Sequence, residues 1–240
     1  MGRARAARGR PVSAARVLAV STGAVRALPW RGREVRTGIR KSQVTGPVAV
    51  TAQGLAGDEQ ADLKHHGGPD KAVLLYPSEH YAAWASELGG LVAPAFGENL
   101  TTAGLVESEV LLGAVYRVGT AVLQVTQPRR PCYKLAVHHG VPDLAVTTQR
   151  TGRTGFYCRV LTPGHLQAGD PLVPLDRPDH GVTAAEAHRV LNVDRADRDG
   201  CLRLLAHPGA LPAQWVDLLR DRLSGRLDDQ SRRLDGPTPA

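Results

Sequence analysis

Residues 121–135 read A-V-L-Q-V-T-Q-P-R-R-P-C-Y-K-L, and this stretch decides the fold class. Its first part, residues 121–126, alternates apolar and polar side chains, which is the period-two pattern of a half-buried β-strand. Pro128 and Pro131 restrict the backbone that follows, because the pyrrolidine ring fixes φ. The stretch therefore predicts a strand that ends in a rigid turn, and it places Cys132 in that turn.

Short segments of the same kind lie on both sides of this strand. The chain contains 26 Gly and 17 Pro, which favour many strands and turns over long helices. A closed or nearly closed barrel is the expected arrangement, because it leaves few strand edges unpaired. The further expected strands are residues 16–21, 48–51, 71–76, 116–118, 158–161 and 172–175.

Helical periodicity appears once among the strands and then dominates the C-terminal quarter of the chain. Ser78 can cap a helix whose apolar residues recur every three to four positions up to Gly89. Three further helices are expected, with Thr183 starting a T-x-x-E capping box, Asp197 capping the second and Pro212 preceding the third. The fold class is therefore mainly β, with a few helices and a small helical domain at the end.

These patterns divide the chain into three parts. We expect a disordered basic tail at residues 1–15, a β-barrel domain at residues 16–178 and a three-helix domain at residues 179–240. The helices are expected to pack on the barrel or on a partner. A helix-turn-helix DNA reader is the alternative, but acidic and basic residues are interspersed in this part and no recognition helix stands out.

The net charge of +7 arises entirely from the start of the chain. Residues 1–41 contain 11 basic residues and one acidic residue, giving +10, whereas residues 42–240 contain 19 basic and 22 acidic residues, giving −3. The Arg-rich first ten residues can resemble a transit peptide or a nucleic-acid-binding arm, and we favour a disordered tail. It lacks the apolar core of a secretory signal, and no apolar run approaches the ~20 residues that span a bilayer. We expect a cytoplasmic protein without a nucleic-acid or membrane partner.

Two polar clusters are candidates for a binding site. Residues 54–71, G-L-A-G-D-E-Q-A-D-L-K-H-H-G-G-P-D-K, combine cationic side chains with glycines that let the backbone approach a ligand. Residues 96–100, F-G-E-N-L, offer a carboxylate and an amide that can hydrogen-bond to the edge of a heterocycle. Taken singly, the first cluster is more often a polar turn, and a tight turn would explain the second equally well.

A third cluster surrounds Cys132, which has three cationic neighbours within three residues. Nearby cations lower the pKa of a thiol from its reference of about 8.5 and favour the thiolate, which ligates metals and attacks electrophiles. The alternative for any free thiol is a small buried apolar residue, and we expect that of Cys158 and Cys201. Three cysteines without a C-x-x-C pair fit a reducing compartment.

The order of these motifs resembles the MOSC domain, a family named after the C-terminal part of molybdenum cofactor sulfurase. Within residues 16–175 the motifs are G-L-A-G-D, H-G-G-P-D-K-A-V, F-G-E-N-L and Q-P-R-R-P-C-Y-K-L. The stretch T-G-R-T-G-F-Y-C-R-V at residues 151–160 and the tail ending R-L-D-D-Q-S-R-R-L are similar to the bacterial subgroup with a three-helix extension. The resemblance covers nearly everything after Arg16.

The resemblance implies a β-barrel that binds the molybdenum cofactor, molybdopterin, with Cys132 as the catalytic residue and the metal ligand. It also implies reduction of N-hydroxylated compounds, such as 6-N-hydroxylaminopurine, to amines or imines. Cationic residues are candidates for the pterin phosphate by charge and matching motif, and the F-G-E-N-L residues for the pterin or the substrate. The cofactor-binding candidates are Lys41, His66, Gly67, Gly68, Lys71, Glu98, Asn99, Arg129, Arg130 and Lys134.

The electrons for such a reduction must come from another protein. The sequence contains no dinucleotide fingerprint and no flavin or Fe–S motif, so a flavoprotein reductase is the expected partner. The sequence leaves open whether the protein forms a homodimer. The alternative function is a molybdenum cofactor or sulfur carrier that delivers its cargo to another enzyme, with a persulfide on Cys132.

Overall fold

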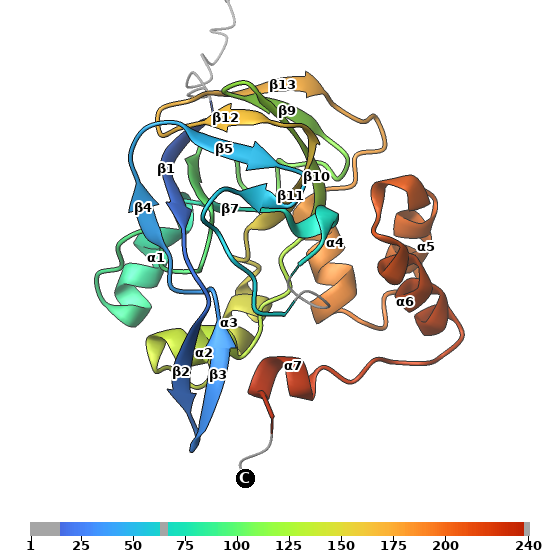
Figure 1. Ribbon diagram of the computed structural model, residues 1–240. Coiled ribbons are helices and arrows are strands. Elements are labelled where there is room, and N and C mark those ends of the chain that lie inside the picture. The colour runs from blue at the N-terminus through green and yellow to red at the C-terminus, as the bar shows by residue number, and fades with distance from the viewer. Residues whose placement is uncertain (1–14, 63–66, 238–240) are drawn as a thin grey trace, which may run out of the picture.

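The protein, a computed structural model, is described for residues 15–62 and 67–237, and its centre is a large β-sheet (Figure 1). The strands of this sheet are β1 (Arg16–Thr22), β4 (Ser42–Val44), β7 (Val73–Pro77), β8 (Leu100–Ala103), β9 (Val115–Val118), β10 (Ala121–Pro128), β11 (Phe156–Thr162) and β13 (Leu172–Asp176). They lie in the order β13-β9-β10-β11-β7-β8-β1-β4. Neighbouring strands are antiparallel except β7 and β8, which run parallel.

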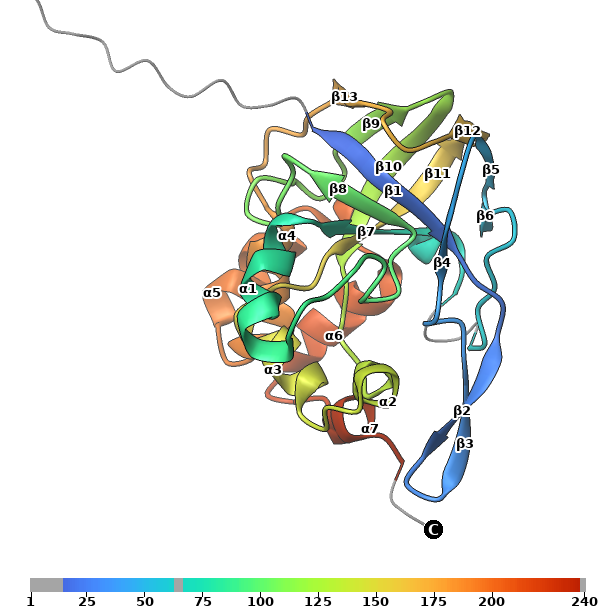
Figure 2. The same ribbon diagram turned by 90° about the vertical axis from the view of Figure 1, so that its left-hand side faces the viewer.

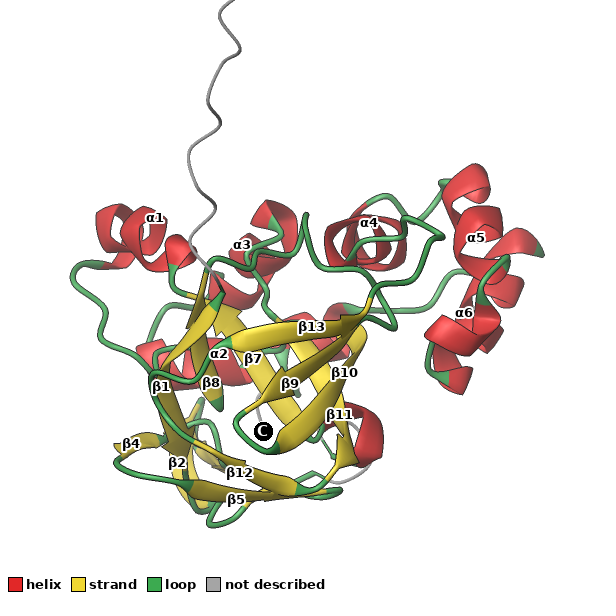
Figure 3. Ribbon diagram, turned by 90° about the horizontal axis from the view of Figure 1, so that it is seen from above, coloured by secondary structure: helices red, strands yellow, loops and turns green. Residues whose placement is uncertain are grey.

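The large sheet curves so that β13, its first strand, comes close to the start of β1, the second strand from its other end (Figure 3). An isolated antiparallel bridge joins Arg16 to Pro171, the residue before β13. The Val17 amide donates to the Asp170 carbonyl at 2.9 Å, and the Leu172 amide donates to the Ala15 carbonyl at 2.8 Å. In the described part of the chain these contacts, and not a continuous ladder, join β13 to β1. The mainly β fold with a few helices is confirmed, while strand pairing defines no fully closed barrel.

Two smaller sheets complete the β structure. One contains β12 (Gly164–Leu166), β5 (Val48–Thr51) and β6 (Gly54–Leu55), and Figure 3 shows β5 and β12 on the side opposite the helices. The other is a hairpin of β2 (Arg26–Trp30) and β3 (Arg33–Thr37), which projects away from the large sheet (Figure 2). The predicted strands are confirmed as β1, β5, β7, β9, β10, β11 and β13.

A two-residue turn sets the shape of the β2–β3 hairpin. Arg31 and Gly32 connect the strands with φ values of 50° and 77°. Positive φ at both central residues is typical of a type I′ turn, whose twist matches that of the paired strands. The Arg31 guanidinium also donates to the Asp235 carbonyl at 3.3 Å, so the tip of the hairpin contacts the C-terminal segment.

The α-helices gather mainly on one side of the strands (Figure 3). They are α1 (Glu79–Leu88), α2 (Lys134–His139), α3 (Leu144–Thr151), α4 (Ala184–His188), α5 (Arg198–Leu205), α6 (Ala213–Leu223) and α7 (Ser231–Asp235). A π-helical turn, Arg189–Val193, continues α4. None of the helices in residues 15–62 and 67–237 has the length and apolar character needed to cross a bilayer.

Two of the predicted caps are confirmed in atomic detail. The Thr183 hydroxyl accepts from the Glu186 amide at 3.1 Å at the start of α4. The Asp197 carboxylate accepts from the Gly200 amide at 2.8 Å at the start of α5. Ser78 occupies the N-cap position of α1, but its side chain makes no capping hydrogen bond there.

The C-terminal helices and the sheet share one hydrophobic core. Val125 on β10 belongs to the same buried cluster as Ala187 on α4, Leu191 in the π-helical turn and Trp215 and Leu219 on α6. Large apolar side chains that are fully buried stabilise a fold by about 1.5–3 kcal/mol each. The helices therefore pack on the sheet, and the division of the chain near residue 178 stays a prediction.

Candidate functional site

Cys132 lies in the short loop between β10 and α2, and it is 5% exposed. The backbone of this loop is held from three directions. The Arg129 amide donates to the Gly155 carbonyl at 3.0 Å, the Tyr133 amide donates to the Arg233 carbonyl at 2.9 Å, and the Cys132 carbonyl accepts from the Leu135 amide at 3.0 Å. The predicted turn after the strand is confirmed, and its backbone is fixed by tertiary contacts as well as by proline.

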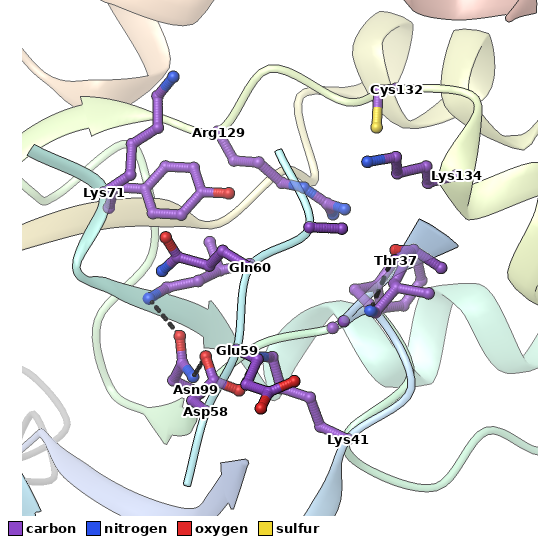
Figure 4. Close-up of a pocket in the computed structure, with 17 residues that line it drawn as sticks. Thr37, Lys41, Asp58, Glu59, Gln60, Lys71, Asn99, Arg129, Cys132 and Lys134 are labelled. Carbon is purple, nitrogen blue, oxygen red and sulfur yellow. Dashed lines mark hydrogen bonds and ion pairs between the residues drawn. The ribbon is translucent and has the colours of Figure 1, made fainter. Parts of the chain in front are cut away.

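A narrow pocket of about 90 Å³ lies between this loop and the base of the β2–β3 hairpin (Figure 4). We call it the inner pocket. Figure 4 shows the side chains of Cys132 and Lys134 directed toward the same part of it. The pocket gathers several predicted site residues from distant parts of the sequence, together with acidic partners. Its charged and polar lining includes Lys41, Asp58, Glu59, Lys71, Asn99, Arg129, Cys132 and Lys134.

Arg129 is the residue of the inner pocket that is best suited to bind a ligand. Its side chain is buried, with 6% of the residue exposed, and its Nη1 atom makes no hydrogen bond to the described residues. A buried donor without a partner costs about 1–3 kcal/mol. Anionic acceptors such as phosphate bind guanidinium groups through strong charge-assisted hydrogen bonds. The position of Arg129 therefore fits an anionic group in the inner pocket.

Lys41 and Asn99 line the same pocket, but Asp58 already engages both side chains. Lys41 forms an ion pair with Asp58, and both side chains are almost completely buried. Burial lowers the pKa of Lys41, and the Asp58 carboxylate acts against this shift. The Asn99 amide donates to Asp58 at 2.8 Å and accepts from the Leu74 amide at 3.0 Å. The Asn99 amide thus stabilises the pocket wall, and its reading of a heterocycle stays a prediction.

Glu98 lies beneath the pocket and does not line it. Its carboxylate is fully buried and accepts from the Phe96 amide at 2.9 Å, the Thr101 hydroxyl at 3.1 Å and the Tyr81 hydroxyl. Burial raises the pKa of Tyr81, and the Glu98 carboxylate adds to the shift. Both Glu98 oxygens therefore have partners within the fold, and a contact of Glu98 with the pterin or the substrate stays a prediction.

The glycines before β7 shape the chain without lining a described cavity. Gly68 has a φ of 94° and precedes the 3₁₀ helix Pro69–Lys71, and its carbonyl accepts from the Lys71 amide at 3.0 Å. Gly67 is likewise absent from the lining of the inner pocket. His66 lies outside the described residues.

A second, larger cavity of about 740 Å³ also reaches Cys132. We call it the outer cavity. Four residues line both cavities, so the two meet at the thiol; these are Lys71, Cys132, Lys134 and Tyr157. Burial raises the pKa of Tyr157, which keeps its phenol protonated and able to donate a hydrogen bond at neutral pH. Tyr157 was not among the predicted site residues, although it lies in the quoted stretch 151–160.

Arg130 lines the outer cavity, whereas Arg129 lines the inner pocket. Its guanidinium donates to Asn192 at 2.9 Å and pairs with Asp228 at 3.2 Å. Burial lowers the pKa of Arg130, and the Asp228 carboxylate acts against that shift. Burial also lowers the pKa of Arg233 to about 10, and the charge of Arg130 adds to it. Of the predicted cations, Lys41 and Arg129 thus line the inner pocket, Arg130 lines the outer cavity, and Lys71 and Lys134 line both.

The C-terminal segment clamps the Cys132 loop from outside. Arg233 on α7 donates to the Pro131 carbonyl and to the side-chain oxygens of Gln149 and Gln230, the latter two at 2.7 and 2.8 Å. Its own carbonyl accepts from the Tyr133 amide. Residues on both sides of the cysteine are thus held by one arginine that lies a hundred residues later in the sequence.

Cys158 and Cys201 have the structural role that the sequence predicts. Both belong to the hydrophobic core and are 1% exposed. Burial raises the pKa of each thiol, so both stay protonated at neutral pH. Of the three cysteines, Cys132 is the one that faces the two cavities.

Comparison with known proteins assigns the chain to a family. The MOSC domain description matches residues 62–173. The chain is 44% identical to Protein YiiM of Escherichia coli over 221 residues, which cover 90% of this chain and 97% of that protein. It is 36% identical over 199 residues to a protein named Reductase of Gibberella moniliformis, covering 80% of this chain and 35% of that protein.

A solved structure agrees with the sequence comparison. The crystal structure of YiiM from Geobacillus stearothermophilus superposes with a TM-score of 0.73 at 37% identity, covering 87% of this chain and 99% of that one. The matched region contains the loop that carries Cys132. This chain belongs to the MOSC domain family.

Proposed function

We propose that this chain is a molybdenum cofactor-dependent reductase of N-hydroxylated compounds, with Cys132 as the protein ligand to molybdenum. Membership of the MOSC family associates the chain with this cofactor. The observation that carries the proposal is the position of Cys132, a nearly buried thiol where two cavities meet. It shares the inner pocket with the buried Arg129 guanidinium, whose Nη1 atom has no hydrogen-bond partner among the described residues.

The residues around Cys132 fit such a cofactor. A cysteine thiolate is a soft ligand, and the bound cofactor would supply two-electron redox chemistry at a metal that prefers sulfur. Arg129 would bind an anionic group of the cofactor, with Lys71 and Lys134 adding positive charge nearby. Lys41 contributes less, because Asp58 already neutralises it.

The net reaction balances with one external electron donor. An N-hydroxylated compound, two electrons and two protons give the amine and one water. The chain would orient the N–OH group beside Cys132, and the protonated Tyr157 phenol is available to donate a hydrogen bond to the departing oxygen. A flavoprotein reductase is the proposed donor.

Turnover separates this proposal from the carrier alternative. The protein is purified from a host that synthesises molybdopterin, its molybdenum is quantified, and reduction of 6-N-hydroxylaminopurine is measured with reduced methyl viologen as donor. We expect turnover proportional to molybdenum content. Protein that contains the cofactor and reduces no N-hydroxylated compound would support a carrier instead.

A substitution at Arg129 tests the anion-binding role. Arg129→Gln removes the charge and should weaken cofactor retention about tenfold, because hydrogen bonds to charged groups contribute about 1.5–3 kcal/mol. Pterin fluorescence after gel filtration measures retention directly. The matched control is Arg117→Gln, an exposed residue on β9 that lines neither cavity. Equal pterin content in Arg129→Gln and wild type would remove Arg129 from the cofactor site.

A further inference from the structure

The β2–β3 hairpin, which projects from the large sheet, concentrates positive charge (Figure 2). Residues 26–40 contain five arginines and one acid, Glu34, giving +4, whereas residues 42–240 together carry −3. None of these arginines forms an ion pair with another residue in the described part of the chain. All five are exposed to solvent; they are Arg26, Arg31, Arg33, Arg36 and Arg40.

A groove of about 270 Å³ connects this charge with the Cys132 loop. We call it the hairpin groove. One side is formed by Trp30 and three of the hairpin arginines, and the other by Tyr133 and Lys134, the two residues that follow Cys132. Lys134 also lines the inner pocket and the outer cavity. A protein that binds to the hairpin therefore lies beside the reactive loop.

The residue types of the hairpin groove are those of protein–protein contacts. Trp30 and Tyr133 are half-buried against a hydrophobic cluster, which holds their rings in place. The Arg31 guanidinium lies 5.0 Å from the centroid of the Trp30 ring. Tryptophan, tyrosine and arginine are the residues that contribute most often to binding energy at protein interfaces. The groove thus combines fixed aromatic rings with exposed guanidinium groups.

The positive charge continues from the hairpin groove into the outer cavity. Tyr133, Lys134 and Pro237 line both. The lining of the outer cavity contains five basic and three acidic side chains. One of these cations, Arg232 on α7, is exposed and forms no ion pair with another described residue. Cationic surface therefore extends from the hairpin past the Cys132 loop to α7.

The partner that this surface fits is an acidic protein that delivers electrons. The proposed reaction consumes two electrons and two protons per turnover, and the sequence contains no flavin or Fe–S motif of its own. A fully reduced flavin carries two electrons and two protons, and it is oxidised as the N–OH group is reduced to the amine and water. Electron-transfer partners form small interfaces, and opposite charges steer their association.

We infer that the β2–β3 hairpin and the hairpin groove bind the acidic face of a flavin-containing electron donor. This inference rests on the proposed function and deepens it, because it assigns the donor a surface and a charge. The exposed arginines attract the donor, and the groove orients it beside the loop that carries Cys132.

Charge reversal on the hairpin tests the inference. The double variant Arg33→Glu/Arg36→Glu changes two exposed residues that line neither the inner pocket nor the outer cavity. The matched control is Arg117→Glu/Arg177→Glu, which makes the same charge change on β9 and directly after β13, at the other end of the molecule in Figure 1. Reduction of 6-N-hydroxylaminopurine per molybdenum is measured with two donors, photoreduced flavodoxin, a small acidic flavoprotein, and reduced methyl viologen. Calorimetry measures flavodoxin binding.

With flavodoxin at low ionic strength, we expect the hairpin variant to lose at least tenfold in kcat/KM and in affinity, because electrostatic steering contributes about ten- to a thousandfold. The difference should shrink at an ionic strength of about 1 M, where salt screens exposed charges. Methyl viologen needs no binding surface, so both double variants should match wild type with this donor. The control variant should also match wild type with flavodoxin.

Unchanged flavodoxin turnover and binding in the hairpin variant would overturn the inference, as would equal losses in the control variant. Failure of flavodoxin to bind wild type, or to donate to protein that is active with methyl viologen, would overturn it too. Binding of a short DNA duplex that the hairpin variant alone loses, with flavodoxin turnover unchanged, would assign the surface to nucleic acid instead. If wild type is inactive with methyl viologen, the reductase proposal fails, and flavodoxin affinity alone decides the binding surface.

Discussion

Cys132→Ser should lower the rate of reduction of N-hydroxylated compounds by about a thousandfold or more, equivalent to about 4 kcal/mol in the activation barrier. A serine hydroxyl is a harder ligand than a thiolate and stays protonated at neutral pH, so it does not replace sulfur on a soft metal. The initial rate with reduced methyl viologen, normalised to molybdenum content, measures the effect.

The other cysteines provide the matched control for this experiment. Cys201→Ser places a hydroxyl in the core, which costs stability by about 1–3 kcal/mol but leaves both cavities unchanged. Activity per folded molecule should therefore stay near that of wild type. Full activity in Cys132→Ser, or equal losses in the two variants, would mean that the thiol is not the metal ligand.

The second large effect is expected when the C-terminal segment that holds the Cys132 loop is removed. Deleting residues 230–240 removes Gln230 and the whole of α7, including the guanidinium and the carbonyl of Arg233. The Cys132 loop then loses its contacts at Pro131 and Tyr133. Loss of one hydrogen bond from a charged group, at about 1.5–3 kcal/mol, and of one neutral backbone hydrogen bond, at about 0.5–1.5 kcal/mol, should reduce cofactor retention about thirtyfold or more. Pterin and molybdenum content of the folded protein report the change.

A point variant separates the clamp from general destabilisation. Arg233→Met keeps α7 but removes the bonds to the Pro131 carbonyl and to Gln149. The rate at which iodoacetamide alkylates Cys132 in cofactor-free protein should rise, because the loop is no longer held. Arg226→Met, at an exposed arginine that pairs with Asp221, is the control. If the deletion and Arg233→Met both retain the cofactor and the slow alkylation of wild type, the C-terminal segment does not position the loop.

Much of the fold can be predicted from local patterns. Alternating segments such as residues 121–126 and 16–21 became β10 and β1, and Thr183 and Asp197 cap the predicted helices. Such features depend on neighbours within a few residues. The β2–β3 hairpin was missed because its turn, Arg31-Gly32, lacks the usual Asn-Gly or Asp-Gly signal. Helices α2 and α3 were missed because helices this short form mainly through tertiary packing.

The site is predictable only where the sequence itself brings the residues together. Cys132, Arg129 and Lys134 lie in one motif, and the structure places all three around the inner pocket. The partner of Lys41 was not predictable, because the ion pair with Asp58 depends on how distant loops pack. The contact of Arg233 with the Cys132 loop was likewise not predictable, because Arg233 lies 102 residues after Pro131 in the sequence. The side chains of Glu98, Asn99 and Arg130 are of a kind that could bind a ligand, but in the structure they form hydrogen bonds or ion pairs with other residues of the protein. The sequence does not show these partners.

The central claim is that the Cys132 sulfur binds molybdenum, and X-ray absorption at the molybdenum edge tests it most directly. The spectrum counts sulfur ligands to the metal without requiring turnover or a known substrate. We predict that the wild-type protein shows the two dithiolene sulfurs of the cofactor plus one thiolate, and that Cys132→Ser shows one sulfur ligand fewer. An identical sulfur count in the two proteins, both loaded with molybdenum, would contradict the account.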